Sequence, residues 1–455
     1  MFIKEYHSKD IDLNCIHCLS REMCEKYNVI PRNEDENNIF LLGSNVKQDE
    51  IKYMKFFFKK NIVYEEISEE NFKEIKSMIL GMEEGNLEDN IIFKGIKDNA
   101  SDIHFEPQTD WVNIRYRING TLVLVYKISR EEYLKAVLKI KLMCGMDIAE
   151  KRRPQDGKSF IEYNDKKYDL RVSIIPLING EKIVIRILYC DNFNYTLESL
   201  GFTEDKADKI RKMISAKNGI VIVCGPTGSG KSSTLYTILK ELDAEKLNIT
   251  TLEDPVEVQM MNINQMNLNK KIDMTFANGL RSILRQDPDV IMIGEIRDEE
   301  TAEMAIRASV TGHKVYTTIH CKSPEEVFIR LENMGIKPYM IKESLVGIIS
   351  QRLIKILCSN CKSLDDKNTF RNTKIYKKCG CEACRFTGYE GRQAVGSVCL
   401  YNYRTNNDNN AFTDNLSNKS MKEDVENLLV NGKISYEDYI EFIEGERLDD
   451  YGFTK

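Results

Sequence analysis

The chain has no run of apolar residues that approaches the roughly 18 to 20 needed for a membrane-spanning helix. Its opening residues, MFIKEYHSKDID, also lack the apolar stretch of a signal peptide. An excess of positive charge is missing as well, because the formal net charge is −6. This balance argues against a protein that coats nucleic acid. We therefore expect no direct nucleic-acid partner, although local basic patches remain possible, and we expect any membrane association to go through a partner protein.

Disulfide bonds are also expected to be absent. The chain contains 13 cysteines, an odd number, which favours free thiols or metal ligands over a disulfide framework in a cytoplasmic protein. The 455 residues exceed what one hydrophobic core organises, so we expect about two to four domains.

The first 195 residues divide into two predicted segments. Residues 1–90 are polar, with helical periodicity near Ile51–Phe58 and Glu69–Leu80, and predict a small N-terminal module. Residues 91–195 predict a sheet-bearing α+β domain with a helix at 130–143. Its alternating, strand-like segments are 112–118, 168–175 and 182–188.

The rest of the chain also divides into two segments. Residues 196–400 alternate strand and helix signals, as a parallel α/β nucleotide domain does, and include a cysteine-punctuated segment at 358–384. Residues 401–455 predict an Asn-rich linker and a helical C-terminal tail.

The most specific motif is GPTGSGKS at Gly225–Ser232, which matches the phosphate-loop pattern G-x-x-x-x-G-K-[ST]. A β-branched apolar run precedes it and a helical pattern follows it, as the motif requires. Backbone N–H groups and the helix N-terminus favour a phosphate here, so we expect a nucleoside triphosphate, with Lys231 on its β- and γ-phosphates and Ser232 on Mg²⁺. The predicted nucleotide-binding residues are Gly225, Pro226, Thr227, Gly228, Ser229, Gly230, Lys231, Ser232 and Ser233.

Two acidic clusters follow apolar segments in this region. Glu253, Asp254 and Glu257 come after a predicted strand, where Mg²⁺ or an attacking water is found, although an ordinary turn is the alternative. Glu295 ends the segment VIMIGE and is a candidate general base. Because Gly294 occupies the position where many related enzymes carry a Mg²⁺-binding Asp, a metal or water role for Glu253 or Asp254 becomes more plausible.

Histidines and arginines supply further candidates. His313 and His320 flank a β-branched run and are two of only five histidines, although a lone histidine is more often structural. Arginines that stabilise phosphate charge can complete an ATPase site, although most exposed arginines do not. The arginines that precede the nucleotide domain are Arg115, Arg117, Arg152, Arg153, Arg171 and Arg186.

Paired cysteines predict a structural zinc site. Cys358-x2-Cys361 and Cys381-x2-Cys384 are separated by 19 residues, which falls within a known four-cysteine zinc spacing. Cys379 is an alternative ligand. A nucleic-acid grip is the alternative function, but the nearby cations are few and scattered. A weaker set near the N-terminus comprises His17 and the cysteines Cys15, Cys18 and Cys24.

Taken together, the segments from about Ser101 to Arg392 resemble the type II secretion and type IV pilus assembly ATPase family. The resemblance implies a RecA-like P-loop ATPase domain preceded by a PAS-like α+β domain, with a zinc-binding four-cysteine insertion and a small N-terminal module. It rests on ordered matches such as ASDIHFEP, AEKRRPQDGK, GPTGSGKSSTLY, ITTLEDPVE, LRQDPDVIMIGEIRDEETAEMAIRASVTGH, TTIH and QRL.

The resemblance also implies roles for single residues. Glu295 matches the catalytic glutamate of the family, Glu253, Asp254 and Glu257 match its acidic box, and His313 and His320 match its histidine box. Arg171 and Arg186 resemble the arginines by which the preceding domain contacts nucleotide phosphates, and Arg281 is a further candidate. One departure is Asn119, which replaces the Asp of the usual R-I-D-G sequence.

The function implied is a hexameric motor that hydrolyses ATP with Mg²⁺ and drives a polytopic inner-membrane platform protein to assemble pilin or pseudopilin subunits. The paired cysteines favour assembly over retraction. Two alternatives remain open, a DNA-uptake or DNA-transfer motor and a non-hydrolysing regulatory ring subunit. The sequence does not distinguish a surface pilus, a secretion pseudopilus and a competence pilus from one another.

Overall fold

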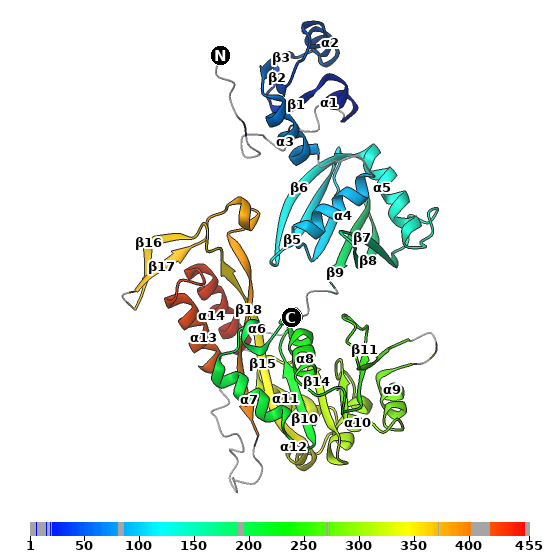
Figure 1. Ribbon diagram of the computed structural model, residues 1–455, viewed down its shortest axis with the longest axis vertical. Helices are drawn as coiled ribbons and strands as arrows, with labels where there is room; N and C mark the ends of the chain where they lie inside the picture. Colours follow the sequence, from blue (N-terminus) through cyan, green and yellow to red (C-terminus); the bar gives the residue numbers. More distant parts are fainter. Residues whose placement is uncertain are drawn as a thin grey trace. The chain divides into compact units, whose positions relative to one another are not determined.

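The computed structural model describes Tyr6, Cys15, Leu19 and residues 21–80, 86–189, 195–269, 272, 274–371, 373–401 and 419–450. The chain forms two compact units, Met1–Tyr189 and Cys190–Lys455 (Figure 1). The division lies a few residues before the boundary expected at 195/196.

The first unit begins with a three-stranded sheet in which β1 and β2 are antiparallel and β2 and β3 are parallel. Alternate strand residues face opposite cores. Ile39 and Leu41 pack with the first two helices, whereas Leu42 packs with the third. The predicted helices near 51–58 and 69–80 are confirmed. The elements are α1 (Arg21–Tyr27), β1 (Val29–Glu34), β2 (Asn38–Gly43), α2 (Gln48–Phe58), β3 (Asn61–Glu66) and α3 (Glu69–Leu80).

A six-stranded sheet follows, in the order β6-β5-β4-β9-β8-β7, with antiparallel neighbours throughout. The predicted strands and the predicted helix at 130–143 are confirmed. The elements are α4 (Leu87–Lys97), β4 (Asp102–Pro107), β5 (Trp111–Ile118), β6 (Thr121–Ser129), α5 (Arg130–Met143), β7 (Gln155–Tyr163), β8 (Lys166–Leu177) and β9 (Gly180–Leu188).

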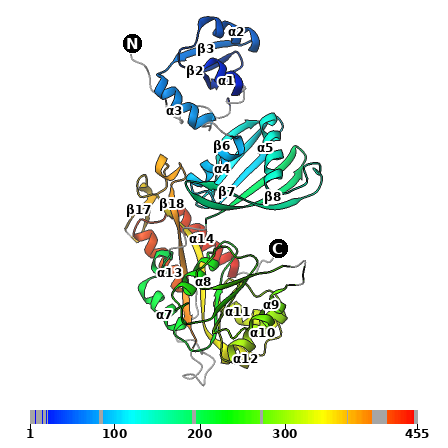
Figure 2. The same ribbon diagram turned by 45° about the vertical axis from the view of Figure 1, so that its right-hand side comes forward.

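The two faces of this sheet differ because strand side chains alternate. Helices α4 and α5 lie on the same side of it, as both ribbon views show (Figure 2). Their apolar residues join one core with alternate strand residues, such as Ile114 of β5 and Val172 of β8. The opposite face carries charged residues from β4, β5, β8 and β9, among them Glu106, Arg171 and Arg186.

The second unit contains a seven-stranded sheet in the order β12-β11-β13-β14-β10-β15-β18. All neighbours are parallel except β15 and β18. The elements are α6 (Leu197–Leu200), α7 (Glu204–Ile214), β10 (Gly219–Cys224), α8 (Lys231–Lys240), β11 (Ile249–Glu253), β12 (Asn264–Asn267), α9 (Phe276–Ile283), β13 (Val290–Ile293), α10 (Glu299–Val310), β14 (Lys314–Ile319), α11 (Pro324–Asn333), α12 (Pro338–Ser344), β15 (Leu345–Leu357) and β18 (Tyr389–Leu400).

Helices cover both faces of this sheet, which is why β10 reads as an uninterrupted apolar run. Ile220 and Ile222 face the core shared with α9, α10, α11 and α12. Val221 and Val223 face the core shared with α7 and α8. This is the RecA-like α/β arrangement that the sequence predicts. The carboxyl ends of β10, β11, β13 and β14 meet at one edge, where ligands bind in such sheets.

Beyond this edge, β15 leads into a two-stranded hairpin of β16 (Ser363–Phe370) and β17 (Thr373–Lys377) and a short helix η4 (Glu382–Cys384). Helices α13 (Lys419–Val430) and α14 (Tyr436–Asp450) bury Met421, Val425 and Tyr439 against residues of β15, β17 and β18. The helical part of the predicted tail thus belongs to the second unit. Residues 402–418, most of the predicted linker, lie outside the described part of the chain.

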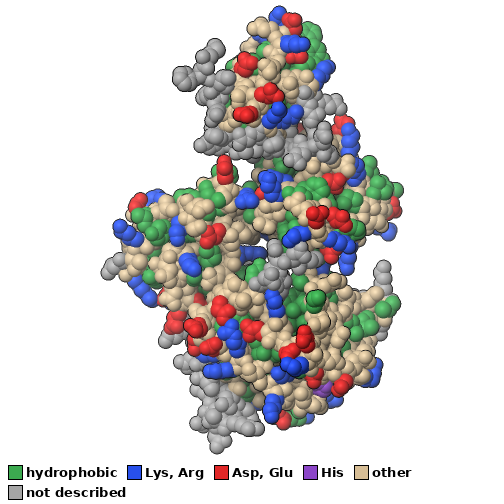
Figure 3. All heavy atoms as spheres, in the orientation of Figure 1, with side chains coloured by type: hydrophobic (Ala, Val, Ile, Leu, Met, Phe, Trp, Pro, Cys, Tyr) green, Lys and Arg blue, Asp and Glu red, His purple; other side chains and the backbone are tan. Residues whose placement is uncertain are grey.

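The surface mixes charges of both signs. On the face drawn in Figure 3, basic and acidic side chains are interspersed over both units, with no broad basic field such as a nucleic-acid coat presents. Among the described residues, no helix has the length and apolarity to cross a membrane.

Candidate functional site

The phosphate loop connects β10 to α8, as predicted. Three of its glycines have positive φ, at 154° for Gly225, 78° for Gly228 and 87° for Gly230. At Gly225 a Cβ atom would lie 2.4 Å from the Gln351 carbonyl oxygen, so a side chain is excluded there. No side chain caps the N-terminus of α8, which leaves its first N–H groups available to a phosphate.

Lys231, the first residue of α8, is buried beside the loop. Its Nζ donates to the carbonyl oxygens of Gly225 and Pro226, both at 2.9 Å. Burial lowers the pKa of this ammonium, and Cys224 and Glu295 oppose that shift. The exposed Ser232 lies beside it on the same pocket. These groups suit a triphosphate with Mg²⁺, because cation, hydroxyl and backbone donors converge on one point.

Gln351 of β15 is hydrogen-bonded to the phosphate loop and to the first turn of α8. Its Nε2 donates to the Ser229 carbonyl at 2.7 Å, and its Oε1 accepts from Thr234 at 2.7 Å. Because Gln351 is buried, it fixes the loop relative to β15. The Ser229 hydroxyl is itself buried and has no hydrogen-bond partner among the described residues.

Glu253 ends β11 and is buried. It accepts hydrogen bonds from Tyr236, from Thr251 at 2.6 Å and from Gln265 at 3.3 Å. Burial raises the pKa of the Glu253 carboxyl, and these three donors moderate the shift. Glu253 is therefore a rigidly held carboxylate rather than part of a solvated turn. The neighbouring Asp254 is exposed.

Glu295 follows β13, and its side chain is 14% exposed. One carboxylate oxygen faces His320 Nε2 at 3.2 Å, and the other is paired with Arg297. His320 itself follows β14 directly. Glu295 is thus oriented by two neighbours, as a general base needs to be.

One pocket of about 220 Å³ brings these groups together. Its predicted members are Thr227, Gly228, Lys231, Ser232, Glu253, Asp254, Glu257, Glu295 and His320. They meet because the loop after β10 and the carboxyl ends of β11, β13 and β14 share one edge of the parallel sheet.

Two predicted residues of this unit lie away from that pocket. His313 precedes β14, whereas His320 follows it, so the strand separates them by roughly 20 Å. The His313 ring contacts the Ala308 carbonyl at 2.9 Å. Arg281 of α9 does not line the pocket and is engaged by Asn278 at 2.8 Å and by Glu300. Within one chain, His313 and His320 therefore cannot act on the same phosphate.

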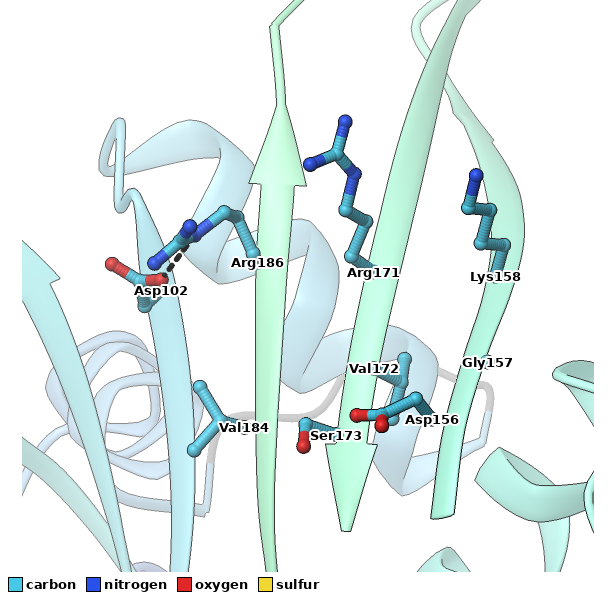
Figure 4. A pocket seen from close by; sticks show the side chains of 9 residues that line it. All are labelled: Asp102, Asp156, Gly157, Lys158, Arg171, Val172, Ser173, Val184 and Arg186. Carbon is cyan, nitrogen blue, oxygen red and sulfur yellow. Dashed lines mark hydrogen bonds and ion pairs between the residues drawn. The ribbon is translucent and has the colours of Figure 1, made fainter. Parts of the chain in front are cut away.

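Four of the six predicted arginines of the first unit lie on strands of the six-stranded sheet and on its open face, namely Arg115, Arg117, Arg171 and Arg186. Arg115 forms a bidentate pair with Glu106, at 2.6 and 2.8 Å. Arg171 and Arg186 line a second pocket, of about 410 Å³ (Figure 4). Arg152 and Arg153 are exposed in the connection between α5 and β7.

The four predicted zinc ligands converge at the base of the β16–β17 hairpin. The sulfur atoms of Cys358, Cys361, Cys381 and Cys384 all lie within 4.8 Å of one another. The separations are 3.9 Å for Cys358–Cys381 and 3.8 Å for Cys361–Cys384. A tetrahedral zinc with Zn–S bonds of about 2.3 Å requires S···S separations of about 3.8 Å. The residues present therefore suit a structural zinc ion.

Backbone donors support this cluster. Burial raises the pKa of the Cys384 thiol, but N–H groups of Cys381 and Gly388, at 3.2 and 3.3 Å, contribute to lowering it to about 7. Such N–H···S bonds stabilise the thiolate that a metal needs. The alternative ligand Cys379 lies outside the cluster, with its sulfur 3.2 Å from Ser363 Oγ. His17 and Cys18 of the weaker N-terminal set lie outside the described residues, whereas Cys15 and Cys24 are buried.

Sequence reasoning did not identify the residues that hold the catalytic candidates. Tyr236, Thr251 and Gln265 surround Glu253, Arg297 pairs with Glu295, and Gln351 supports the phosphate loop. A signal existed for four of them, because Tyr236, Thr251, Arg297 and Gln351 fall within the matched segments GPTGSGKSSTLY, ITTLEDPVE, LRQDPDVIMIGEIRDEETAEMAIRASVTGH and QRL. Gln265 lies outside these segments.

Comparisons with known sequences agree with this arrangement. The model of a family described as Type II/IV secretion system protein matches residues 83–440. The type II secretion system ATPase E of Vibrio cholerae is 43% identical over 317 residues, which are 68% of this chain and 63% of that protein. The type II secretion system protein E of Klebsiella pneumoniae is 42% identical over 322 residues, 69% of this chain and 65% of that protein. The chain thus spans slightly less than two thirds of the length of these relatives.

A further relative is covered more fully, and two solved structures share the fold. The type II secretion system protein HxcR of Pseudomonas aeruginosa is 39% identical over 359 residues, 77% of this chain and 75% of that protein. The pilus retraction motor PilT, solved with bound ADP, superposes with a TM-score of 0.54 at 25% identity, covering 79% of this chain and 97% of that chain. The ATPase DotB of Legionella pneumophila gives a TM-score of 0.59 at 21% identity, covering 78% and 95%.

Proposed function

The chain belongs to the family described as Type II/IV secretion system protein, and from this membership we propose that it is a motor ATPase. ATP hydrolysis would power the assembly of a type IV pilus or a type II secretion pseudopilus. The observation that carries the proposal is the pocket in which Lys231, Ser232, Glu253 and Glu295 meet.

Each residue of this pocket has a separate role in hydrolysis. Lys231 exchanges its bonds to the loop carbonyls for bonds to the β- and γ-phosphates of the substrate. Ser232 would hold Mg²⁺, which when bound neutralises phosphate charge. Glu295, oriented by His320 and Arg297, accepts a proton from the attacking water. Glu253 and Asp254 orient water around this centre.

Arginines outside this pocket have proposed roles as well. Arg171 and Arg186 of the first unit bind substrate phosphates and stabilise the charge that develops during transfer. Arg281 and His313 are proposed to act on nucleotide only in an assembly of several chains, because both lie away from the pocket of their own chain.

The partners follow from the same proposal. The chain works in the cytoplasm as a homohexamer at the inner face of the membrane. It acts on a polytopic platform protein there, and through it on pilin or pseudopilin subunits. The four-cysteine cluster, with zinc bound, stabilises the fold and has no part in hydrolysis, because four protein ligands leave no open position.

The test uses Glu295→Gln, with Glu303→Gln as a control that removes one carboxylate from the exposed face of α10. We expect Glu295→Gln to lose at least about 100-fold in kcat, the size of a general-base contribution. ATP binding, measured by calorimetry with Mg²⁺, should survive in Glu295→Gln and fail in Lys231→Ala. If Glu295→Gln hydrolyses ATP at the wild-type rate, Glu295 is not the general base.

Coupling to the machinery is tested separately. The cytoplasmic domain of the platform protein should bind the chain in a pull-down and raise its rate of ATP hydrolysis. Stimulation by DNA, without stimulation by the platform domain, would instead identify a DNA motor. If the wild-type chain hydrolyses no ATP in the presence of the platform domain or of DNA, the chain would instead be a regulatory ring subunit.

A further inference from the structure

One side chain outside the nucleotide pocket is bonded on both sides of the phosphate-binding residues. Gln351 of β15 is 1% exposed. Its Nε2 donates to the Ser229 carbonyl at 2.7 Å, and its Oε1 accepts from the Thr234 hydroxyl at 2.7 Å. Ser229 belongs to the phosphate loop and Thr234 to the first turn of α8. The two hydrogen bonds therefore lie on either side of Lys231 and Ser232 in the chain.

Two glycines of the loop pack closely against the same residue. A Cβ atom at Gly225 would lie 2.4 Å from the Gln351 carbonyl oxygen, and a Cβ atom at Gly230 would lie 3.1 Å from Gln351 Nε2. The loop therefore meets both the backbone and the side chain of Gln351. It has no room to move closer to β15.

The hydrogen bond to Ser229 also fixes the direction of a backbone N–H group. A peptide unit is planar and trans, so the Ser229 carbonyl and the Gly230 N–H point in opposite directions. Because Gln351 holds the carbonyl on the side of β15, the Gly230 N–H is directed away from β15. Backbone N–H groups are the donors with which a glycine-rich loop binds phosphate.

The chemistry of this contact requires an amide. A carbonyl oxygen only accepts hydrogen bonds, so the partner of Ser229 must be a donor, and the oxygen of the same amide accepts from Thr234. Glutamate in place of Gln351 would set a second acceptor against the Ser229 carbonyl. Leucine would leave two buried polar groups unpaired, which destabilises the arrangement that they hold.

We propose that Gln351 is a positioning residue for the triphosphate. Through Ser229 and Thr234 it holds the loop N–H groups and the Lys231 ammonium in the arrangement that binds the β- and γ-phosphates. The inference rests on the proposed ATPase function and adds to it one residue that does not line the pocket.

The expected effect is on nucleotide binding rather than on the chemical step. Glu295 is oriented by His320 and Arg297, whereas the Gln351 amide bonds to the loop and to α8. Phosphate contacts that are lost equally from the ground state and the transition state raise KM and leave kcat unchanged. A residue that only stabilises the fold would instead lower the active fraction, so that kcat falls at an unchanged KM.

Gln351→Leu in the full-length chain tests the role. We expect the KM for ATP and the dissociation constant for ADP, measured by calorimetry with Mg²⁺, to rise about tenfold, with kcat within about twofold of the wild type. Gln393→Leu is the matched control, because Gln393 lies on the neighbouring strand β18 and its amide contacts the Gly201 carbonyl at 3.5 Å. Its KM and kcat should match the wild type.

Thr234→Val removes only one of the two hydrogen bonds, so its KM should rise about threefold. If Gln351 acts as one bridge, Thr234→Val combined with Gln351→Leu raises KM no more than Gln351→Leu alone. Thr237→Val is the control, because the buried Thr237 hydroxyl bonds within α8, to the Ser233 carbonyl at 2.8 Å. Thermal unfolding establishes that each variant is folded.

Hydrogen exchange gives a readout that needs no turnover. In the nucleotide-free chain, exchange over residues 225–234 should be faster in Gln351→Leu than in the wild type, while β14 stays protected. Gln393→Leu should leave exchange over residues 225–234 unchanged.

The outcomes separate this inference from the function on which it rests. A wild-type chain that neither binds nor hydrolyses ATP contradicts the proposed function. If the wild type hydrolyses ATP and Gln351→Leu has the KM and the dissociation constant of Gln393→Leu, only the role of Gln351 is overturned. A lower kcat at unchanged KM in Gln351→Leu overturns it as well, since Gln351 would then be merely structural. Increases in KM that multiply in the cycle with Thr234 contradict the single bridge.

Discussion

Glu253 shows at the residue scale how a fold tunes one carboxyl group. Burial disfavours its charged form, whereas the hydroxyls of Tyr236 and Thr251 and the amide of Gln265 favour it. The pKa of Glu253 therefore lies above its ordinary value by a margin that depends on these donors. Tyr236 has a second role, because its hydroxyl accepts from the Glu257 backbone N–H at 3.1 Å.

Tyr236→Phe tests this balance. The substitution removes a cause that lowers the pKa of Glu253, so the pKa should rise further. Because the ionised form is needed to orient water, the acidic limb of the kcat profile should move to higher pH, with kcat about tenfold lower at neutral pH. The measurement is the pH dependence of kcat at saturating ATP.

Tyr116→Phe is the control for Tyr236→Phe. It also removes a buried tyrosine hydroxyl, which donates to the Ile91 carbonyl at 2.5 Å, but no carboxylate is involved. Its pH profile should coincide with that of the wild type. An unshifted profile in Tyr236→Phe would show that Glu253 is not titrating in catalysis.

At the scale of elements, the open face of the six-stranded sheet is joined by ion pairs across strands. Glu106 of β4 binds Arg115 of β5 at 2.6 and 2.8 Å and Lys182 of β9 at 2.8 Å. Burial raises the pKa of Glu106, but these partners lower it to about 2 in the folded chain. Because the pKa of Glu106 is lower in the folded chain than in the unfolded chain, the ionised carboxylate stabilises the fold at every pH above the ordinary pKa of a glutamate. This stabilisation is lost as the pH falls towards 2.

Glu106→Gln should accordingly destabilise the first unit by roughly 2 kcal/mol at neutral pH, and the difference should shrink as the pH falls from about 4.5 towards 2. Trp111 of β5 is the only tryptophan of the chain, so its fluorescence reports denaturant unfolding of this sheet. Glu131→Gln, which removes an exposed carboxylate from α5, should leave the midpoint unchanged. A pH-independent difference would contradict the ion-pair account.

The four-cysteine cluster lies at the base of the β16–β17 hairpin, and α13 and α14 pack against this region. We expect one zinc ion per chain in the wild type and in Cys379→Ser, and none in Cys384→Ser, measured by elemental analysis. Without the metal, hydrogen exchange should rise in β16, β17 and α13, while β10 and α8 stay protected. Equal zinc content in Cys379→Ser and Cys384→Ser would contradict the ligand set.

At the scale of the whole molecule, the chain combines a sheet that is covered on both faces with a sheet that is covered on one. The first carries the phosphate loop at its carboxyl edge, and the second exposes cations on its open face. A motor of this family is proposed to work as a ring, so its assembly should respond to nucleotide.

Ring formation is tested by the mass of the full-length chain in solution. Glu295→Gln with ATP and Mg²⁺ should form particles of six copies of the 52.7 kDa chain, measured by light scattering. Lys231→Ala under the same conditions should not respond to ATP, because the ammonium that holds the phosphates is missing. A chain that stays monomeric with ATP and Mg²⁺ would exclude the ring mechanism.

Features encoded by neighbouring residues were predictable from the sequence. The strand, turn and helix around Gly225–Ser232, the helix at 130–143 and the cysteine pairs each lie within a short stretch, where local periodicity and spacing carry the signal. The general place of Glu295 was predictable for the same reason, since it lies two residues after the end of a buried strand.

The tertiary structure alone decided which distant residues meet. Gln351 supports the phosphate loop from 122 positions away, and His320 reaches Glu295 while His313 lies at the opposite end of β14. Strand register placed Lys158 beside Arg171 and Arg186. The physical reason is that strand order and register follow from burying all the apolar faces at once, a property of the whole chain that no single segment contains.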